Sequence, residues 1–189
     1  MNPIRLTTPL RKEDVGKLRA KDIVTITGTI VTARDKAYAR VVSSKRPPLD
    51  LRGAVVYNCG PIVIRKNKSW EIVSAGPTTS ARMGKMQVEF VKRTGVRAIL
   101  GKGGVDKEVA SELARLGCIY LAFPGGTGAL AAEFVSRVED VHWLDLGSAE
   151  AMWVLRVREF GPLLTAIDTK GNNLYSSIRK SKHLIPEKI

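Results

Sequence analysis

Residues 96–123, VRAILGKGGVDKEVASELARLGCIYLAF, decide the fold class. The apolar run at 96–100 predicts a short strand, and the run at 118–123 predicts a second one. Between them lies a helical pattern closed by Gly117, with an apolar face formed by Val105, Val109, Leu113 and Leu116. A strand, a helix and a strand in this order predict a right-handed crossover between two parallel strands.

The same alternation continues on both sides of this segment. Helices are predicted at 79–95, ended by Gly95, at 127–137 and, after an N-cap at Ser148, at 149–160. Further strands are predicted at 140–146 and 162–168. We therefore expect the C-terminal half to contain alternating helices and largely parallel strands.

The N-terminal half is rich in predicted strands. Runs of β-branched and apolar residues separated by Gly, Pro and Asn occur at 22–33, 54–60, 61–67 and 70–76. The segment at 43–53 predicts a loop, because its consecutive prolines cannot join a β-ladder. The expected fold is α/β in one domain over 1–189, with a core at about 6–178 and a basic tail at 179–189.

Composition places the chain among folded proteins. Hydrophobic residues make up 44% of the 189 residues and charged residues 26%. The sequence contains no apolar run of the roughly 18 residues that cross a bilayer. Its first residues, MNPIRLTTPLRKEDV, lack the apolar segment of a signal peptide. We expect a cytoplasmic protein with no membrane partner.

The formal net charge of +13 attracts anions of every kind, from nucleic acid to an acidic subunit or a small carboxylate. Aromatic residues make up only 6% and do not alternate with the basic residues, as they do in proteins that stack on single strands. We therefore expect no nucleic-acid partner. A basic binding module without catalysis remains the alternative to an enzyme.

Thiols and imidazoles are too few for a metal site of this chain's own. Cys59 and Cys118 are the only cysteines, and neither they nor His142 and His183 have metal-ligand spacing. An iron–sulfur cluster is commonly held by four thiolates. The sequence therefore predicts no metal ligand and no complete cluster here.

Two glycine-rich turns carry a cation near a predicted helix start. Residues 74–84, SAGPTTSARMG, contain Arg82, and GKGG at 101–104 contains Lys102. Backbone N–H groups and the helix dipole favour an anion at such a point, at the carboxyl edge of a parallel sheet. A tight chain reversal with a solvated Arg82 is the simpler alternative. A third turn, FPGGTG at 123–128, also follows a strand.

Residues 70–83, WEIVSAGPTTSARM, closely resemble the signature of the β subunit, or C-terminal domain, of class I iron–sulfur fumarases and the related L-tartrate dehydratases. The resemblance extends over residues 6–178 through TGTIVTARD (27–35), NCGPIV (58–63), GKGG (101–104), WLDLGSAEAMW (143–153) and IDTKGNNLY (167–175). It implies a swivelling β/β/α fold. It also implies a hydro-lyase that interconverts fumarate and L-malate, or dehydrates L-tartrate.

The resemblance also implies which groups do the chemistry. The [4Fe–4S] cluster, with one open iron, is expected on a partner α subunit, and a dimer of heterodimers is the expected assembly. Arg34, Arg82 and Lys102 correspond to ligands of the carboxylates of a C4 dicarboxylate. Thr78 corresponds to the residue proposed to move the C3 proton, and Thr79 is expected to support it.

Some positions depart from the family pattern or stay open. Tyr38 stands where we expect a histidine, and a phenol is no base near neutral pH. FPGGTGAL also departs from the alanine-richer run expected there, and either change could alter the choice among fumarate, tartrate and a methylated analogue. Asp35 could orient Arg34 or be an ordinary turn residue. Trp70, Trp143 and Trp153 are expected to be core or interface aromatics. Cys59 is expected to be a buried, inert thiol, with a place on the active-site face as the alternative.

Overall fold

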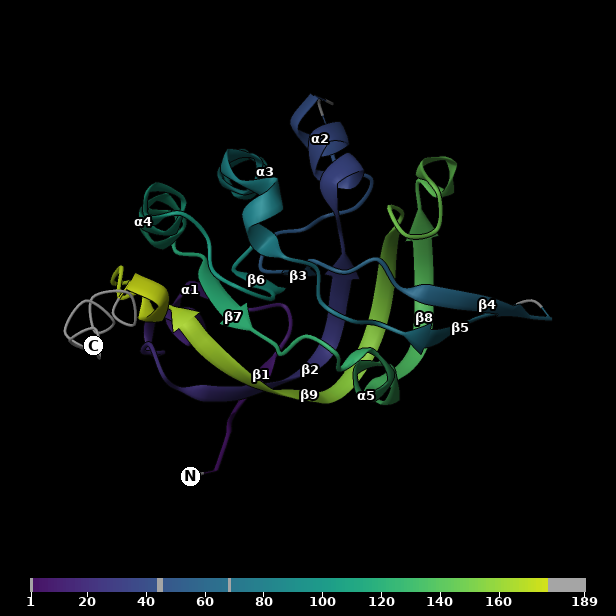
Figure 1. Ribbon diagram of the computed structural model, residues 1–189, viewed down its shortest axis with the longest axis horizontal. Coiled ribbons are helices and arrows are strands. Elements are labelled where there is room, and N and C mark those ends of the chain that lie inside the picture. Colours follow the sequence, from purple (N-terminus) through teal and green to yellow (C-terminus); the bar gives the residue numbers. More distant parts are fainter. Residues whose placement is uncertain (1, 44–45, 68, 177–189) are drawn as a thin grey trace, which may run out of the picture.

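The computed structural model describes residues 2–43, 46–67 and 69–176, and its centre is a mixed β-sheet (Figure 1). Within these residues the sheet has seven strands in the order β1-β2-β3-β6-β7-β9-β8. Their bounds are β1 (Ile4–Thr7), β2 (Ile23–Thr32), β3 (Val55–Tyr57), β6 (Ala98–Gly101), β7 (Ile119–Ala122), β8 (Val135–His142) and β9 (Met152–Ile167). Strand β9 also pairs with β2, which closes β2, β3, β6, β7 and β9 into a ring.

Strand direction divides the sheet. β1, β2, β3, β6 and β7 pair in parallel in that order. The long strand β9 runs antiparallel to β2, β7 and β8. The α/β class and the parallel block around β6 and β7 are confirmed. The last two strands, β8 and β9, instead pair antiparallel to each other.

Helices cover the outside of the parallel block. Helices α2 (Asp35–Ser43), α3 (Lys85–Thr94) and α4 (Lys107–Arg115) lie side by side on one face of the sheet (Figure 1). Successive residues of β3 alternate between two cores: Val55 and Tyr57 face one, and Val56 faces the helices. Two further short helices are α1 (Lys12–Gly16) and α5 (Gly128–Glu133).

The predicted helix at 149–160 is wrong, because 149–151 belong to a turn and 152–160 to the strand β9. Met152, Trp153, Val154 and Leu155 are all buried. A strand buried on both faces reads as a continuous apolar run, which periodicity does not separate from a helix. Ser148 therefore caps no helix; its carbonyl instead accepts a hydrogen bond from the indole of Trp153 at 2.8 Å.

Other boundaries also differ from the prediction. The predicted helix at 79–95 is interrupted at Gly84, whose φ of +46° separates the 3₁₀ turn η1 (Ser80–Met83) from α3. The predicted helix at 127–137 ends at Glu133, because β8 begins at Val135. β1, α1 and α2 lie where no element was predicted. The predicted loop is present over 46–53, and the basic tail lies outside the described residues.

Strands β4 (Ile62–Lys66) and β5 (Ser69–Ser74) form a separate antiparallel hairpin that projects from the sheet (Figure 1). Trp70, the second residue of β5, meets the fully buried Trp153 edge-on, with ring centroids 5.2 Å apart. This contact anchors the hairpin and confirms a core role for Trp153. Among the described residues, no helix is long and apolar enough to span a membrane.

Candidate functional site

The predicted site residues gather at one edge of the parallel sheet. Arg34 follows β2, Asn58 follows β3 and Lys102 follows β6. These strands are neighbours and parallel, so their carboxyl ends meet at the same edge. In open α/β sheets this is the edge where ligands bind. The topology therefore brings together segments that are far apart in the sequence.

The turn that contains Thr78 and Thr79 is fastened to this edge by its backbone. The Thr78 N–H donates to the Asn58 carbonyl at 2.6 Å, and the Lys102 N–H donates to the Thr78 carbonyl at 3.2 Å. The Ser80 N–H in turn donates to the Lys102 carbonyl at 3.1 Å. Thr79 and Lys102 thus face each other in a parallel β-bridge. Both threonines are held between the ends of β3 and β6.

A cavity of about 640 Å³ opens beside this bridge. Thr79, Lys102 and Gly103 line one part of it, and the turn at 123–125 lines another. The remaining wall is largely apolar and is formed by Ile23, Ala122, Pro162, Leu164 and Tyr175. Of the five predicted site residues, Thr79 and Lys102 line the cavity, whereas Arg34, Thr78 and Arg82 lie outside its lining.

Arg34 is tightly enclosed but has spare hydrogen-bonding capacity. Its Nε lies 3.5 Å from Glu150 Oε1, and the side chain is 21% exposed. Nε is buried and finds no hydrogen-bond partner among the described residues. A Cβ at Gly60 would lie 2.6 Å from Arg34 Nη1, so the glycine of the NCG motif makes room for the guanidinium. A guanidinium in this state can still bind an anion.

Arg82 lies in η1 and points toward α2. Its Nη2 donates to Asp35 Oδ2 at 3.1 Å, and its side chain is 53% exposed. The interpretation that Asp35 orients Arg34 is therefore wrong: Asp35 pairs with Arg82, and Glu150 is the carboxylate beside Arg34. The placement of Arg82 in the first turn of a long helix is also wrong, since α3 starts three residues later.

A network of buried polar side chains lies beneath the turn. Tyr38 Oη donates to Asn58 Oδ1 at 2.7 Å, and Asn58 Nδ2 donates to Ser80 Oγ at 2.7 Å. Tyr120 Oη lies 2.9 Å from Ser80 Oγ, and Gln87 Nε2 donates to the Ser80 carbonyl at 2.9 Å. Burial raises the pKa of Tyr38 well above its ordinary value. Tyr38 is therefore a neutral member of this network and does not replace a histidine base.

Sequence reasoning missed five residues that support the site: Asn58, Ser80, Gln87, Tyr120 and Glu150. A usable signal was present for Tyr120, which interrupts the apolar strand CIYLAF with a hydroxyl. A buried polar group requires a partner, so such an interruption indicates a network. The positions of the partners follow only from the three-dimensional fold.

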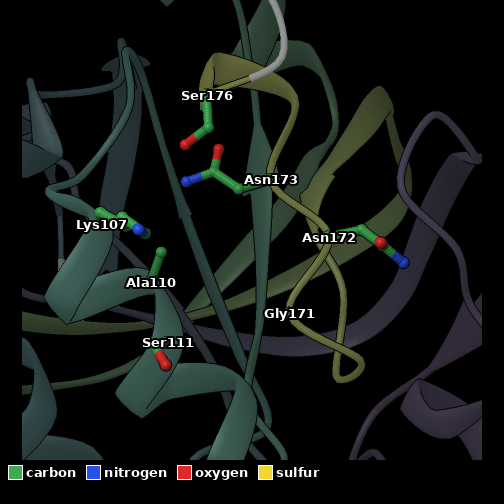
Figure 2. A pocket seen from close by; sticks show the side chains of 7 residues that line it. All are labelled: Lys107, Ala110, Ser111, Gly171, Asn172, Asn173 and Ser176. Carbon is green, nitrogen blue, oxygen red and sulfur yellow. The ribbon is translucent and has the colours of Figure 1, made fainter.

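A second cavity, of about 330 Å³, lies between α4 and the segment at 171–176 (Figure 2). Asn173 and Ser176 point toward each other on one side of it, and Lys107 lies along the helix, whereas Asn172 points away (Figure 2). None of the predicted site residues lines this cavity, and Lys107 is the one cation among its lining residues. The edge at Lys102 is therefore the stronger candidate site.

Comparison with known sequences identifies the family of this chain. A model of the family described as Fumarase C-terminus matches residues 1–178. The chain belongs to this family. It is 44% identical over 176 residues to the L(+)-tartrate dehydratase subunit beta of Escherichia coli K12, with 93% of this chain and 88% of that protein covered. It is 47% identical over 176 residues to a putative L(+)-tartrate dehydratase subunit beta of Methanocaldococcus jannaschii, with 90% of each chain covered.

A longer relative aligns through only part of its length. The putative fumarate hydratase class I of Geobacillus stearothermophilus is 38% identical over 179 residues, which cover 94% of this chain and 34% of that protein. The predicted membership in the β-subunit family of class I fumarases and L-tartrate dehydratases is confirmed. In this member of the fumarase C-terminus family, TTSARM and GKGG are the two segments joined by the Thr79–Lys102 bridge.

The iron–sulfur cluster implied for such enzymes does not fit the described part of this chain. Cys59 and Cys118 are both fully buried, and burial raises the pKa of each thiol, that of Cys118 to about 12. A cluster ligand must be a thiolate. Within the described residues, no three His, Cys, Asp or Glu side chains lie close enough together to hold a metal ion.

Proposed function

We propose that this chain is the β subunit of a heteromeric class I fumarate hydratase, which reversibly hydrates fumarate to L-malate. The observation that carries the proposal is the clamping of the Thr78–Ser80 turn against Lys102, at the edge where Arg34 also lies. This arrangement joins hydroxyl groups and cations in one place. Membership in the fumarase C-terminus family supports the same reaction class.

The substrate needs more than one cation, because it carries two carboxylates. In the proposed site, Lys102 and Thr79 bind one carboxylate inside the cavity. The guanidiniums of Arg34 and Arg82 bind the other, for which their planar forks allow bidentate contacts. Each arginine already faces one carboxylate, Glu150 or Asp35, which orients it without filling all its donors.

Thr78 is the proposed proton-transfer residue. Its Oγ1 exchanges the proton on the substrate carbon C3, next to the carbon that carries the hydroxyl group. A short backbone hydrogen bond to Asn58 fixes the backbone position of Thr78, from which its hydroxyl group extends. Proton transfer by a positioned side chain commonly contributes about 10²- to 10⁴-fold to a rate.

The remaining chemistry is assigned to a partner. We place the [4Fe–4S] cluster on an α subunit, where it would supply a Lewis acid for the substrate hydroxyl. This chain then supplies carboxylate binding and proton transfer at the shared site. The relatives from Escherichia coli and Methanocaldococcus jannaschii are themselves named as beta subunits. A dimer of heterodimers is the assembly we propose.

L-Tartrate is the second candidate substrate, because the relatives at 44% and 47% identity are named for it. L-Tartrate differs from L-malate by one hydroxyl group, so the same cations would bind both. The two candidates differ only in the group placed near C3. Substrate competition on one preparation therefore separates them.

The test is anaerobic reconstitution. The chain is expressed together with a candidate α subunit of the same family of enzymes. Turnover of L-malate and L-tartrate is followed by the ultraviolet absorbance of fumarate and by oxaloacetate formation. We expect activity from the complex and none from this chain alone. Iron-dependent turnover by the isolated chain would contradict the division of labour. A complex inactive on both acids would leave the basic binding module as the better hypothesis.

A further inference from the structure

Four buried side chains form a continuous hydrogen-bonded line from α2 to the loop after β6. It runs from Tyr38 through Asn58 and Ser80 to Tyr120, and ends at the carbonyl of Gly103, 3.0 Å from Tyr120 Oη. All four side chains are fully buried. The line therefore connects α2, the end of β3, the Thr78–Ser80 turn and the segment that carries Lys102.

Proton counting fixes the direction of this line. A hydroxyl has one proton, and the Gly103 carbonyl can only accept, so Tyr120 donates to Gly103. Ser80 then donates to Tyr120 and receives the amide proton of Asn58. Tyr38 donates to the oxygen of the same amide. Burial raises the pKa of both tyrosines, so their hydroxyls stay protonated and every link keeps its donor.

The centre of the line has no spare room. A Cβ at Gly101 would lie 2.0 Å from Ser80 Oγ and 3.2 Å from Tyr120 Oη. From the other side, Gln87 donates to the Ser80 carbonyl at 2.9 Å. Ser80 is thus fixed through both its side chain and its backbone. Aligned hydrogen bonds in a buried setting also strengthen one another.

We propose that this line is a positioning device that sets Thr78 and Thr79 in register with Lys102. It joins the same segments as the backbone hydrogen bonds of Thr78, Ser80 and Lys102, but approaches them from the interior. It is also neutral, so it holds the turn without placing a carboxylate beneath the substrate cations. The kinetic consequence rests on the proposed function, whereas the structural consequence belongs to this chain alone.

The structural test uses hydrogen exchange of this chain by NMR. Tyr120→Phe removes the last link and leaves Ser80 and the Gly103 carbonyl without their partner. We expect the Ser80 and Lys102 amides to exchange about 10- to 100-fold faster, while amides in the β2–β9 pair keep their rates. Tyr38→Phe, at the far end of the line, should give a smaller effect at the same amides and is the second variant if Tyr120→Phe does not fold.

Thr94→Val is the matched control. Thr94 Oγ1 is a buried hydroxyl that donates to the Phe90 carbonyl at 2.6 Å within α3, outside the line. We expect this variant to leave the Ser80 and Lys102 amides unchanged. If Tyr120→Phe and Tyr38→Phe accelerate all amides equally, or neither changes these two, the residues are ordinary core residues and the proposal is overturned.

The kinetic test uses the reconstituted complex. Tyr120→Phe should lower kcat about tenfold or more with KM changed less than about threefold, since the turn loses its register but the cations remain. Thr94→Val should leave both constants unchanged. A wild-type complex without hydro-lyase activity would refute the proposed function but leave the exchange result intact. An active complex in which Tyr120→Phe has wild-type kinetics would refute the positioning role.

Discussion

The Lys102 edge and the turn at 168–172 both contain enclosed charges, but they satisfy them differently. Asp168 is fully buried, and its carboxylate accepts hydrogen bonds from the backbone of Ala20, Lys170 and Asn172 and from the Asn172 side chain, at 2.8 to 3.0 Å. Arg34, by contrast, has a buried Nε without a hydrogen bond in the described structure. The fold therefore supplies hydrogen-bond partners for the carboxylate of Asp168 but leaves Nε of Arg34 without one.

This difference separates a structural charge from a ligand-binding one. A buried charge is costly unless it is paired and hydrogen-bonded. Asp168 therefore contributes to stability only because neighbouring N–H groups donate hydrogen bonds to its carboxylate. Arg34 and Arg82 each meet one carboxylate and keep donors in reserve. We infer that changes at the Lys102 edge alter activity and leave stability nearly intact, whereas changes at Asp168 do the opposite.

The largest effect is expected from Thr78→Ala. Loss of the hydroxyl that moves the C3 proton should lower kcat of the reconstituted complex about 10²- to 10⁴-fold, with a smaller change in KM. The backbone hydrogen bond to Asn58 does not involve the side chain, so the melting temperature should stay close to wild type. Steady-state kinetics and a thermal melt give both values. A kcat within threefold of wild type would remove Thr78 from the reaction.

Arg82→Ala should have the next largest effect. Loss of a charge-assisted, bidentate contact costs on the order of 2–4 kcal/mol, or roughly 30- to 1000-fold in kcat/KM. Arg82→Lys should recover only part of this loss, because an ammonium group lacks the planar fork. Stability should change by less than about 1 kcal/mol, since the pair with Asp35 is half exposed.

Arg52→Ala is the control for that variant. Arg52 also pairs with a neighbouring carboxylate, Asp50, but lies on the exposed surface away from the Lys102 edge. Its removal should leave kcat/KM unchanged. Equal kinetic losses in Arg52→Ala and Arg82→Ala would indicate general electrostatic steering by this basic chain. In that case the contact proposed for Arg82 would be wrong.

The sequence predicted the part of the fold where local pattern and tertiary environment agree. The β6–α4–β7 unit was predictable because its helix has one apolar face and its strands are short and bounded by glycines. The start of β9 was not predictable, since its first four residues, Met152–Leu155, are all buried and show no alternation between buried and exposed positions. Gly95 ends α3, as predicted, and the structure shows it in the left-handed conformation.

The sequence predicted which residues form the candidate site, but it did not predict most of their contacts. GKGG could be placed at the carboxyl edge of the sheet, because it follows a strand of the parallel block. The TTSARM turn could not be placed there by the same argument, since it follows β5 of the separate hairpin and reaches the edge through its hydrogen bonds to Asn58 and Lys102. The partners of the cations could not, since Glu150 and Asp35 reach them through the packing of β9 and α2. Tyr120 reaches Ser80 across 40 positions of sequence, a distance over which one sequence gives no contact information.

Asp168→Asn tests whether the buried carboxylate of Asp168 serves stability and not activity. Burial alone would raise the pKa of Asp168, but hydrogen bonds from Asn172, Ala20 and Lys170 outweigh this and lower the pKa. A carboxyl with a lowered pKa stabilises the fold above its unfolded pKa of about 3.9, and this stability is lost as pH falls through the folded pKa.

We therefore expect Asp168→Asn to lose about 1–3 kcal/mol of unfolding free energy at pH 7. The difference from wild type should shrink as the pH falls below about 4. Urea titrations at several pH values measure this difference, and kcat of the reconstituted complex should remain at the wild-type level. A large loss of activity at wild-type stability would place Asp168 in the site and break the comparison.

The smallest effect is expected in the reactivity of the two thiols toward an alkylating reagent. Their relative rates test whether the Lys102 edge opens locally. Cys59 lies beneath the site turn, bridged to Pro77, whereas Cys118 lies in the loop before β7. Burial raises the pKa of Cys59, an effect that the positive charge of Arg34 opposes but does not reverse, and burial raises the pKa of Cys118 to about 12.

At pH 8, a thiol with a pKa near 12 is a thiolate in only about one molecule in 10⁴, and the thiolate is the reactive form. Both cysteines should therefore be nearly inert to iodoacetamide in the folded chain and react fully in denaturant, as peptide mass spectrometry can follow. Equal slow rates would mean that both thiols are reached only by global opening. A Cys59 rate more than about tenfold above that of Cys118 would show that the site turn opens independently. Tyr120→Phe should then raise the Cys59 rate selectively, because it removes a hydrogen bond that holds the turn closed.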